Sequence, residues 1–267
     1  MWLRRLILLI AILFFLFPII WIMMASLKSP VDILAYPPKW LFKPTIEHFV
    51  EVLGSADFLR AFRNSTIVSA SSLAFNLLIG VPAAYALARF QFKARRDVSF
   101  WILSTRMTPQ VAVLIPFYLM FRTLHLMDSL TALIIMHVVL NIALVIWMMK
   151  GFFQELPKEL EEVALIDGCN RIVAFFRIML PLSRNGIIAT SILTTIFSWN
   201  ELVFALVITG SRSQTAPVAI FSYITYNEIK YGDLAAAAVL IAIPVIIFVA
   251  FVQKYLIRGL TLGAVKQ

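Results

Sequence analysis

Several of the most hydrophobic runs of this sequence contain polar side chains, and a polar group at membrane depth is costly enough to be a candidate for function. These residues are Asn76, Arg106, Gln110, His137, Asn141, Asn200 and Glu201. Amides and charges bind the hydroxyl groups of a solute, His and Glu relay protons, and all of them hydrogen-bond neighbouring helices. We therefore expect the seven residues either to line a path for a polar solute or to hold helices together.

The depth of each residue follows from the rise of a helix, about 1.5 Å per residue, counted from the predicted cytoplasmic end. Arg106 and Asn141 then lie about 12–13 Å deep, and Glu201 lies about 24 Å deep. A second level, about 18–20 Å deep, holds Gln110, His137 and Asn76. We expect no direct salt bridge between Arg106 and Glu201 unless a helix is broken or strongly tilted. Arg106 still requires a partner, water or a substrate, because it stays charged.

The side-chain patterns of common catalytic mechanisms are missing from the sequence. It has no Gly-x-x-x-x-Gly-Lys-Ser/Thr loop for ATP phosphates, no Gly-x-Ser-x-Gly, no His-Glu-x-x-His and no paired carboxylates within a hydrophobic run. Cys169 is the one cysteine, and the histidines at 48, 125 and 137 lack metal-ligand spacing. We expect a protein that is not an enzyme and itself binds no cofactor or metal.

The elements that must position the polar residues are membrane helices, because 61% of the residues are hydrophobic and the mean hydropathy is +0.92. A span needs about 20 apolar residues. The predicted spans are Leu6–Leu27, Thr66–Ala88, Val98–Phe121, Leu130–Met149, Asn185–Thr209 and Leu234–Ile257. The first run is longer than a signal peptide core and lacks a cleavage site, which predicts a retained anchor. Pro109, Pro116 and Pro244 are expected to kink their spans.

Basic residues predict the orientation of these spans. Arg4 and Arg5 precede the first span, residues 89–96 hold four basic side chains, and Lys150–Arg184 holds five. Both termini and the loop 150–184 are therefore expected in the cytoplasm. The external loop Lys28–Ser65 also holds five basic residues, but its four acids and its length weaken their effect. The sequence predicts one all-α membrane domain over residues 1–267, and the formal charge of +9 is explained without nucleic acid.

The segment Glu159–Pro181 lies in that cytoplasmic loop and combines an acidic half with an apolar half. Pro157 and the acids after it favour a helix start, and Gly168 favours its end. Leu160, Val163, Ala164 and Asp167 are spaced to share one narrow face. A second helix is predicted from about Arg171, with Ile172, Phe175, Phe176 and Met179 on a broad apolar face. Pro181 is expected to end this second helix.

This helix–glycine–helix segment either rests on lipid headgroups or docks on another protein. Its apolar second half suits lipid, but its first half, together with Glu155 just before it, holds five of the chain's 14 acids, which anionic headgroups would repel. A basic groove on a protein partner is the better match for that half.

The same segment carries a family resemblance. Glu162-Val163-Ala164, three residues, Gly168, nine residues and Ile178-Met179-Leu180-Pro181 resemble the "EAA" loop of ABC importer permeases, with Val163 in place of an alanine. Ser198-Trp199-Asn200-Glu201 and the tail Arg258-Gly259-Leu260-Thr261-x-Gly263-Ala264-Val265-Lys266 are similar to runs of the carbohydrate-uptake, maltose-type, binding-protein-dependent permeases. With the six predicted spans, the resemblance covers essentially the whole chain.

The resemblance implies a subunit of a bacterial inner-membrane importer for a sugar, polyol or related small polyhydroxylated solute. Its implied partners are a second permease subunit, identical or homologous, two cytoplasmic ATPase subunits that use ATP and Mg, an external solute-binding protein and membrane lipid. The loop would act as a coupling helix docked on the ATPase. By the family pattern, Glu162, Ala164 and Gly168 would shape the docking turn. Ile178, Leu180 and Pro181 would brace the loop against the membrane domain.

Two other functions remain open at this level. An ion-gradient-driven secondary transporter would use Arg106, His137 or Glu201 as relays, although the sequence shows no internal repeat and no paired carboxylates. A non-transporting assembly or insertion factor is the third possibility.

Overall fold

The computed structural model describes residues 2–264, except for the side chains of Leu3 and of residues 252–264. Its helices are α1 (Trp2–Ser26), α2 (Pro30–Ile33), α3 (Glu47–Gly54), α4 (Ala56–Arg89), α5 (Arg95–Met107), α6 (Gln110–Thr123), α7 (Leu130–Glu155), α8 (Glu159–Ile166), α9 (Arg171–Ala174), η1 (Phe175–Met179), α10 (Leu180–Leu182), α11 (Arg184–Trp199), α12 (Val203–Ile208), α13 (Ala216–Ala219), η2 (Ile220–Tyr223) and α14 (Tyr231–Ala264). Over residues 2–264 the pairing of extended backbone is limited to one isolated bridge, between Ile224 and Ile229. The predicted all-α class is confirmed.

Several of these helices are long and apolar enough to cross a membrane. Four segments within residues 2–264 are long and apolar enough by themselves: Arg4–Ser26, Ala56–Arg89, Leu130–Glu155 and Tyr231–Phe251. Two helix pairs pass the same test only when each is taken as one bent span, α5 with α6 and the segment Arg171–Leu182 with α11. The chain therefore has four helices that can cross a membrane, or up to six if each bent pair counts once.

The predicted third span, Val98–Phe121, is not one helix. Helix α5 ends at Met107, Thr108 adopts an extended conformation (φ −68°, ψ 125°), and α6 leaves at a bend of 94°. The break is favoured by Pro109, because the ring of a proline disfavours helical geometry at the residue before it. Pro116 and Pro244, by contrast, lie inside helices that continue through them.

The predicted fifth span, Asn185–Thr209, is also broken, although it contains no proline or glycine after its first turn. Helix α11 ends at Trp199, and the short helix α12 begins at Val203. The carboxylate of Glu201 accepts the N–H groups of Phe204 (2.8 Å) and Ala205 (3.1 Å). These are N–H groups that an intact helix would pair internally, so Glu201 stabilises the break by capping a new helix.

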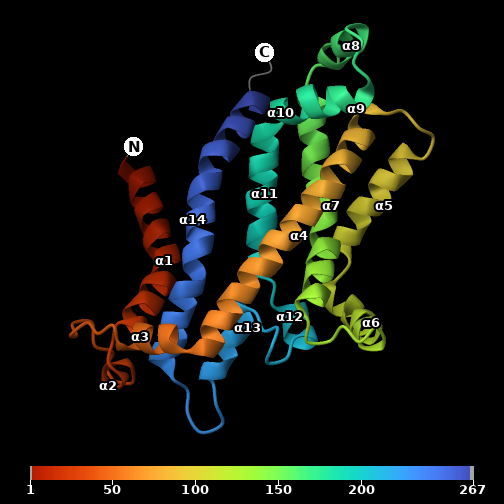
Figure 1. The fold of residues 1–267 in the computed structure, drawn as a ribbon. Helices are drawn as coiled ribbons and strands as arrows, with labels where there is room; N and C mark the ends of the chain where they lie inside the picture. Colours follow the sequence, from red (N-terminus) through yellow and green to blue (C-terminus); the bar gives the residue numbers. More distant parts are fainter. Residues whose placement is uncertain (1, 265–267) are drawn as a thin grey trace. The chain divides into compact units, whose positions relative to one another are not determined.

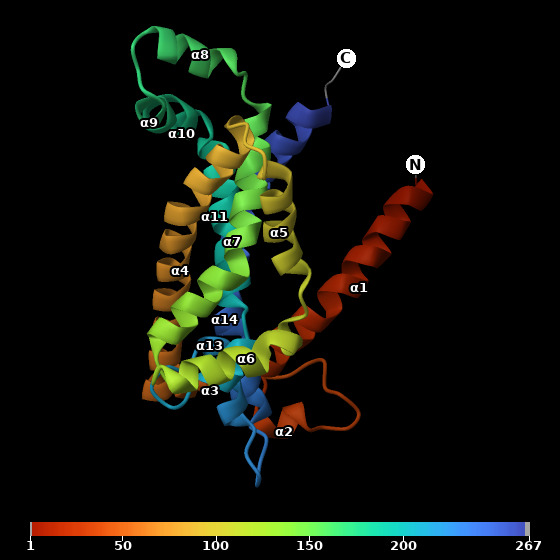
Figure 2. The ribbon, with the colours of Figure 1, turned by 90° about the vertical axis from the view of Figure 1, so that its right-hand side faces the viewer.

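The chain forms two compact units, one from residues 1–63 and 214–244 and one from residues 64–213 and 245–267, as far as these residues are described. In the larger unit, α7 packs against α5, α11 and α12. Figures 1 and 2 show α8 and α9 at one end of α7, and α6 at the other end. Helix α4 approaches α7 closely at Gly80, where a Cβ atom would lie 2.8 Å from Cγ1 of Val145.

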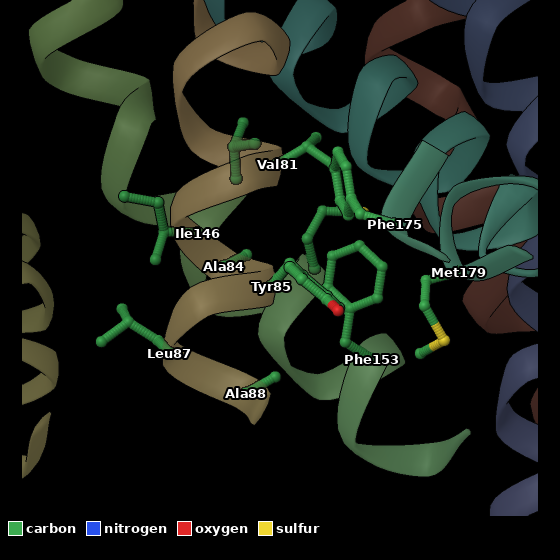
Figure 3. Close-up of a cluster of buried hydrophobic side chains, with 11 residues drawn as sticks. Val81, Ala84, Tyr85, Leu87, Ala88, Ile146, Phe153, Phe175 and Met179 are labelled. Carbon is green, nitrogen blue, oxygen red and sulfur yellow. The ribbon is translucent and has the colours of Figure 1, made fainter. Parts of the chain in front are cut away.

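The apolar core of the larger unit lies at the α8 end. Tyr85 of α4, Phe153 of α7 and Phe175 of η1 are mutually packed, with ring centroids 4.8–6.3 Å apart, and Figure 3 shows the three rings facing one another. Met179 and Met149 are fully buried in the same cluster. Aromatic packing of this kind joins three segments that are distant in the sequence into one rigid end.

The smaller unit contains the predicted external loop up to Arg63, and this stretch includes helix α3. His48 of α3 is buried, and its Nδ1 lies 2.6 Å from the carboxylate of Asp233 while its Nε2 lies 3.0 Å from the carbonyl oxygen of Lys28. The ammonium of Lys28 lies over the rings of Trp21 and Phe42. These contacts order the loop by side-chain interactions within the protein, with half of α3 left exposed.

The connection between α6 and α7 is fastened by Asp128. Its carboxylate accepts hydrogen bonds from the N–H groups of Gly210 and Ser213, from the Ser213 hydroxyl (2.7 Å) and from Arg212. Burial alone would raise the pKa of this carboxyl, but the bonds from Ser213, Gly210 and Arg212 outweigh burial and lower the pKa to about 2. The ionised carboxylate therefore stabilises the folded state.

We predict that Asp128→Asn lowers the free energy of unfolding at neutral pH by about 2 kcal/mol, because the pKa lies below its unfolded value of 3.8. This contribution is complete above pH 3.8 and is lost as the pH falls through the folded pKa. Thermal unfolding in detergent at a series of pH values measures it. The exposed Asp97→Asn is the matched control, and an equal loss in both variants would contradict the assignment.

Candidate functional site

A cavity of about 590 Å³ lies in the larger unit where the chain leaves helical geometry twice. Its lining comes from the end of α5, the start of α6, the middle of α7 and the α11–α12 break. The lining residues are Thr105, Arg106, Thr108, Gln110, Val113, Phe117, Met136, Val139, Leu140, Asn141, Phe197, Asn200, Glu201, Leu202 and Val203. Non-helical backbone at membrane depth is tolerated where it borders such a cavity.

Arg106 lies on the last turn of α5 and faces this cavity. Its Nη1 donates to the carbonyl oxygen of Leu140 (2.9 Å), and its guanidinium lies 4.8 Å from the ring centroid of Phe197. Neither contact neutralises the charge, since one partner is a carbonyl and the other an aromatic ring. The guanidinium thus remains available to a polar or negatively charged group in the cavity.

Glu201 lines the same cavity but directs its carboxylate away from Arg106. Both of its oxygens cap α12, and one also lies 3.5 Å from Nε2 of His137. Helix α11 is broken, which was the condition set for an Arg106–Glu201 contact, yet Arg106 bonds to Leu140 instead. The break after α11 therefore does not bring the Glu201 carboxylate into a salt bridge with Arg106.

His137 and Asn76 lie behind the cavity and do not line it. Nδ1 of His137 is 2.6 Å from the hydroxyl of Ser198, which is 3.1 Å from that of Ser72. Asn141 donates to the His137 carbonyl at 3.0 Å, and Asn76 reaches the same oxygen at 3.5 Å. His137 and Asn76 are buried and connect α4, α7 and α11, which is the helix-joining role of intramembrane polar residues.

The structure thus divides the seven intramembrane candidates. Arg106, Gln110, Asn141, Asn200 and Glu201 come together at the cavity. The aromatic rings of Phe117 and Phe197 are in the lining as well. Sequence reasoning did not single out these rings or Ser72, because phenylalanine and serine are common in apolar helices and nothing local distinguishes these three.

The segment Glu159–Pro181, predicted to lie in the cytoplasm, is the second candidate site, and its helix–glycine–helix form is confirmed. Helix α8 ends at Ile166, and Gly168 follows with φ +88°, a left-handed conformation that glycine adopts without strain. Asn170 then caps α9 by accepting the N–H of Val173 at 2.8 Å. The turn between the two helices is therefore fixed by local sequence.

The second helix ends one residue beyond its predicted end at Pro181. A π-helical turn, η1, follows α9, and α10 carries the helical backbone through Pro181 to Leu182. The bend of 74° falls at Ser183, before α11. The wider turn lets the N–H of Leu180 reach the carbonyl of Phe175, so the chain passes the proline, which lacks an N–H, without stopping.

Helix α8 presents a different face from the predicted one. Of the four residues expected to share an apolar strip, Ala164 is buried, whereas Leu160, Val163 and Asp167 are exposed. Glu162 and Ile166 are exposed as well. Because Val163 is 56% exposed, replacing the family's alanine by valine adds methyl groups outside the core.

The inward side of α8 instead carries Glu161, which sequence reasoning did not single out. Its carboxylate accepts the hydroxyl of Tyr85 at 2.7 Å and lies 3.5 Å from Nε of Arg89. A usable signal exists in the sequence, because Glu161 precedes Ala164 by three residues and so shares its face. The family tail cannot be assessed in the same way, since Val265 and Lys266 and the side chains before them lie outside the described residues.

A multi-pass helical protein with a cavity that is partly lined by polar side chains at two helix breaks, and with a helical elbow at one end, has the architecture of a transport subunit. Residues 76–262 match the family described as "Binding-protein-dependent transport system inner membrane component", and the chain belongs to this family. It is therefore a permease subunit of an ABC importer rather than an enzyme.

Individual relatives agree over nearly the full length. The chain is 38% identical to the probable ABC transporter permease protein y4oR of Sinorhizobium fredii and 35% identical to the diacetylchitobiose uptake system permease protein DasC of Streptomyces coelicolor, over 94% of this chain and 91% of each relative. The fold is similar to that of a chain in a bacterial ABC transporter involved in the import of the acidic polysaccharide alginate, with a TM-score of 0.80, 24% identity and 95% of both chains covered. Family membership decides against the secondary transporter and the non-transporting factor.

We predict that Glu201→Ala destabilises the protein by about 1 kcal/mol or more, the usual cost of losing a helix cap. The N–H groups of Phe204 and Ala205 would then be buried without an acceptor. Thermal unfolding of the purified chain measures this, with Glu155→Ala, which removes an exposed carboxylate at the end of α7, as the control. Equal stability of the Glu201→Ala variant and the original chain would show that the break does not depend on the carboxylate.

Proposed function

We propose that this permease imports a sugar, a polyol or a related small polyhydroxylated solute. The observation that carries the proposal is the lining of the cavity, which combines the amides of Gln110, Asn141 and Asn200 with the charge of Arg106. Amides and charges hydrogen-bond hydroxyl groups, and the rings of Phe117 and Phe197 offer apolar faces on which a sugar ring packs. The 35% identity to a permease subunit of a diacetylchitobiose uptake system supports the carbohydrate class.

We place the chain in the inner membrane as one domain with six spans. These are α1, α4, the bent pair α5 with α6 counted as one crossing, α7, α11 continued by α12 as in the predicted span Asn185–Thr209, and α14. The basic residues of 1–5, 89–96 and 150–184 then put both termini and α8 in the cytoplasm.

The importer is completed by other chains. A second permease subunit, homologous or identical, faces the open side of the cavity, and an external binding protein delivers the solute. Two cytoplasmic ATPase subunits bind ATP and Mg.

Coupling to the ATPase is assigned to α8 and the turn after it. Glu162 and Val163 are exposed for docking, Ala164 packs inward, and Gly168 sets the turn. Ile178 and Leu180 pack against the buried cluster that contains Tyr85 and Phe175, and Pro181 follows them at the bend. When ATP draws the two ATPase subunits together, α8 moves with its docking cleft and the braced elbow passes the movement to the spans.

We predict that Gly168→Val leaves membrane insertion intact and uncouples transport, because a β-branched residue is strained at φ +88° and would change the turn. The measurements are the amount of ATPase subunit that co-purifies with the permease and the ATP-driven uptake of a solute found by thermal-shift screening of the binding protein.

The matched control is Gly151→Ala, where a Cβ atom meets open space and the backbone is helical. Normal uptake and normal ATPase retention by Gly168→Val would count against the coupling role of the turn.

We predict that Arg106→Leu lowers uptake of that solute about tenfold, the effect of about 1.4 kcal/mol, because the cavity loses its cation. ATPase retention should not change, since Arg106 lies far along the chain from α8. Arg122→Leu, on α6 and outside the cavity lining, serves as the control. Unchanged uptake by Arg106→Leu would remove Arg106 from the solute path.

A further inference from the structure

Glu161 is the buried acid of α8. Its residue surface is 6% exposed, whereas Glu159 and Glu162 of the same helix are exposed. The side chains of Glu161 and Arg89 are 8% and 4% exposed. A charge this far from water persists only with a partner, so the carboxylate and the guanidinium depend on each other.

Arg89 joins more than one segment. It is the last residue of α4, and its Nη2 donates to the carbonyl oxygen of Leu156 at 2.8 Å. Leu156 is the residue that ends α7 and begins the cytoplasmic loop. The guanidinium therefore fixes the exit of the loop from α7 and, through Glu161, the helix that follows.

Tyr85 connects this polar contact to the apolar core. Its hydroxyl donates to Glu161, and its ring packs against Phe153 of α7 and Phe175 of η1, as Figure 3 shows for the three rings. One side chain of α4 thus touches both halves of the elbow. Movement of α8 away from Tyr85 would separate a charge-assisted hydrogen bond and expose the edge of the core.

The remaining side chains of α8 offer no comparable link to a spanning helix. Ala164, the other buried residue of α8, has no polar side-chain atom, and Leu160, Val163 and Ile166 are exposed. In the part of the chain that the structure describes, the polar side-chain contacts of α8 with a spanning helix are those of Glu161 with α4.

We propose that Glu161 is a positioning residue that fastens α8 to α4, so that a tilt imposed on α8 moves α4 with it. This inference rests on the proposed docking of α8 on an ATPase. Glu162 and Glu161, adjacent in sequence, then have opposite tasks: the exposed one faces the partner and the buried one holds the permease. A buried ion pair suits the second task, because separating it leaves two uncompensated charges.

The test uses the full-length permease, with Cys169→Ser so that spin labels attach only at introduced cysteines. Labels at Ile166→Cys on α8 and Leu78→Cys on α4 occupy exposed positions and report the distance between the two helices. Distances are measured in the permease alone, in complex with the ATPase, and in that complex with ATP, Mg and vanadate. The variants are Glu161→Gln, which removes the charge and keeps the size, and the milder Tyr85→Phe. Glu159→Gln is the control on the same helix.

The original chain and Glu159→Gln should give one narrow distance in each condition. In Glu161→Gln, the population at that distance should fall about tenfold, or about 1.4 kcal/mol, and in Tyr85→Phe it should fall less. Glu161→Gln leaves Arg89 buried without its counter-charge, so its unfolding temperature should fall below that of Glu159→Gln. The same direction of change in distance in Tyr85→Phe, which keeps both charges, separates loss of positioning from loss of fold. An unchanged distance distribution in Glu161→Gln overturns the inference.

The distances measured in the permease alone test whether Glu161 holds α8 to α4, independently of any binding to the ATPase. A wild-type permease that fails to bind the ATPase would contradict the proposed function, whereas equal distances in Glu161→Gln and the original chain would contradict only the role of Glu161. The two failures are therefore distinguishable.

Discussion

Lipid offers no hydrogen bonds to a peptide group, and this constraint determines where the chain can leave helical geometry. Each break must supply its own partners. At Asn200 they come from the Glu201 carboxylate, which takes two N–H groups of α12, and from the Asn200 amide, which donates to Ile196 at 2.9 Å. At Pro109 the residue after the break has no N–H to satisfy, so the proline reduces the need for partners there. Both breaks border one cavity, since the geometry that interrupts a helix also leaves room beside it.

The intact helix between the breaks is α7, and the other elements of the larger unit are arranged around it. It packs against α5, α11 and α12, its Leu140 carbonyl receives Arg106, and its His137 meets Ser198. These polar contacts hold the broken spans in register with the unbroken one. At the α8 end, aromatic packing holds the helices together instead, because Phe153 of α7 lies in the buried cluster next to the elbow.

The sequence allowed prediction of features that depend on neighbouring residues. The helix class, the turn at Gly168 and the start of α9 at Arg171 follow from hydropathy and from the conformational preferences of glycine and asparagine. The 94° bend did not follow, because a proline inside an apolar run either kinks a helix or ends it, and the choice depends on what packs behind it. Pro116 and Pro244 show the opposite outcome with the same residue type. The break at Asn200 had no local signal besides the family run in which it lies.

Burial of charge was the least predictable property, because it depends on pairs that are far apart in sequence. In the sequence, Glu161 and Arg89 are indistinguishable from the other charged residues of the predicted cytoplasmic loops. Each can be buried only because the other compensates its charge. The same holds for His137, whose partner Ser198 lies on another helix. A single sequence identifies such residues as costly but does not show whether they face a cavity or a neighbouring helix.

The separation between Glu201 and its neighbours in the cavity has a consequence for how such importers diversify. The groups that maintain the breaks, namely the Glu201 cap and the buried Ser72, His137 and Ser198, are largely different from the other side chains that line the cavity. Residues such as Gln110, Asn141 and Phe197 can then be exchanged without dismantling the frame that shapes the cavity. A lineage can thus acquire a new cargo by substitutions at the lining while inheriting its architecture unaltered.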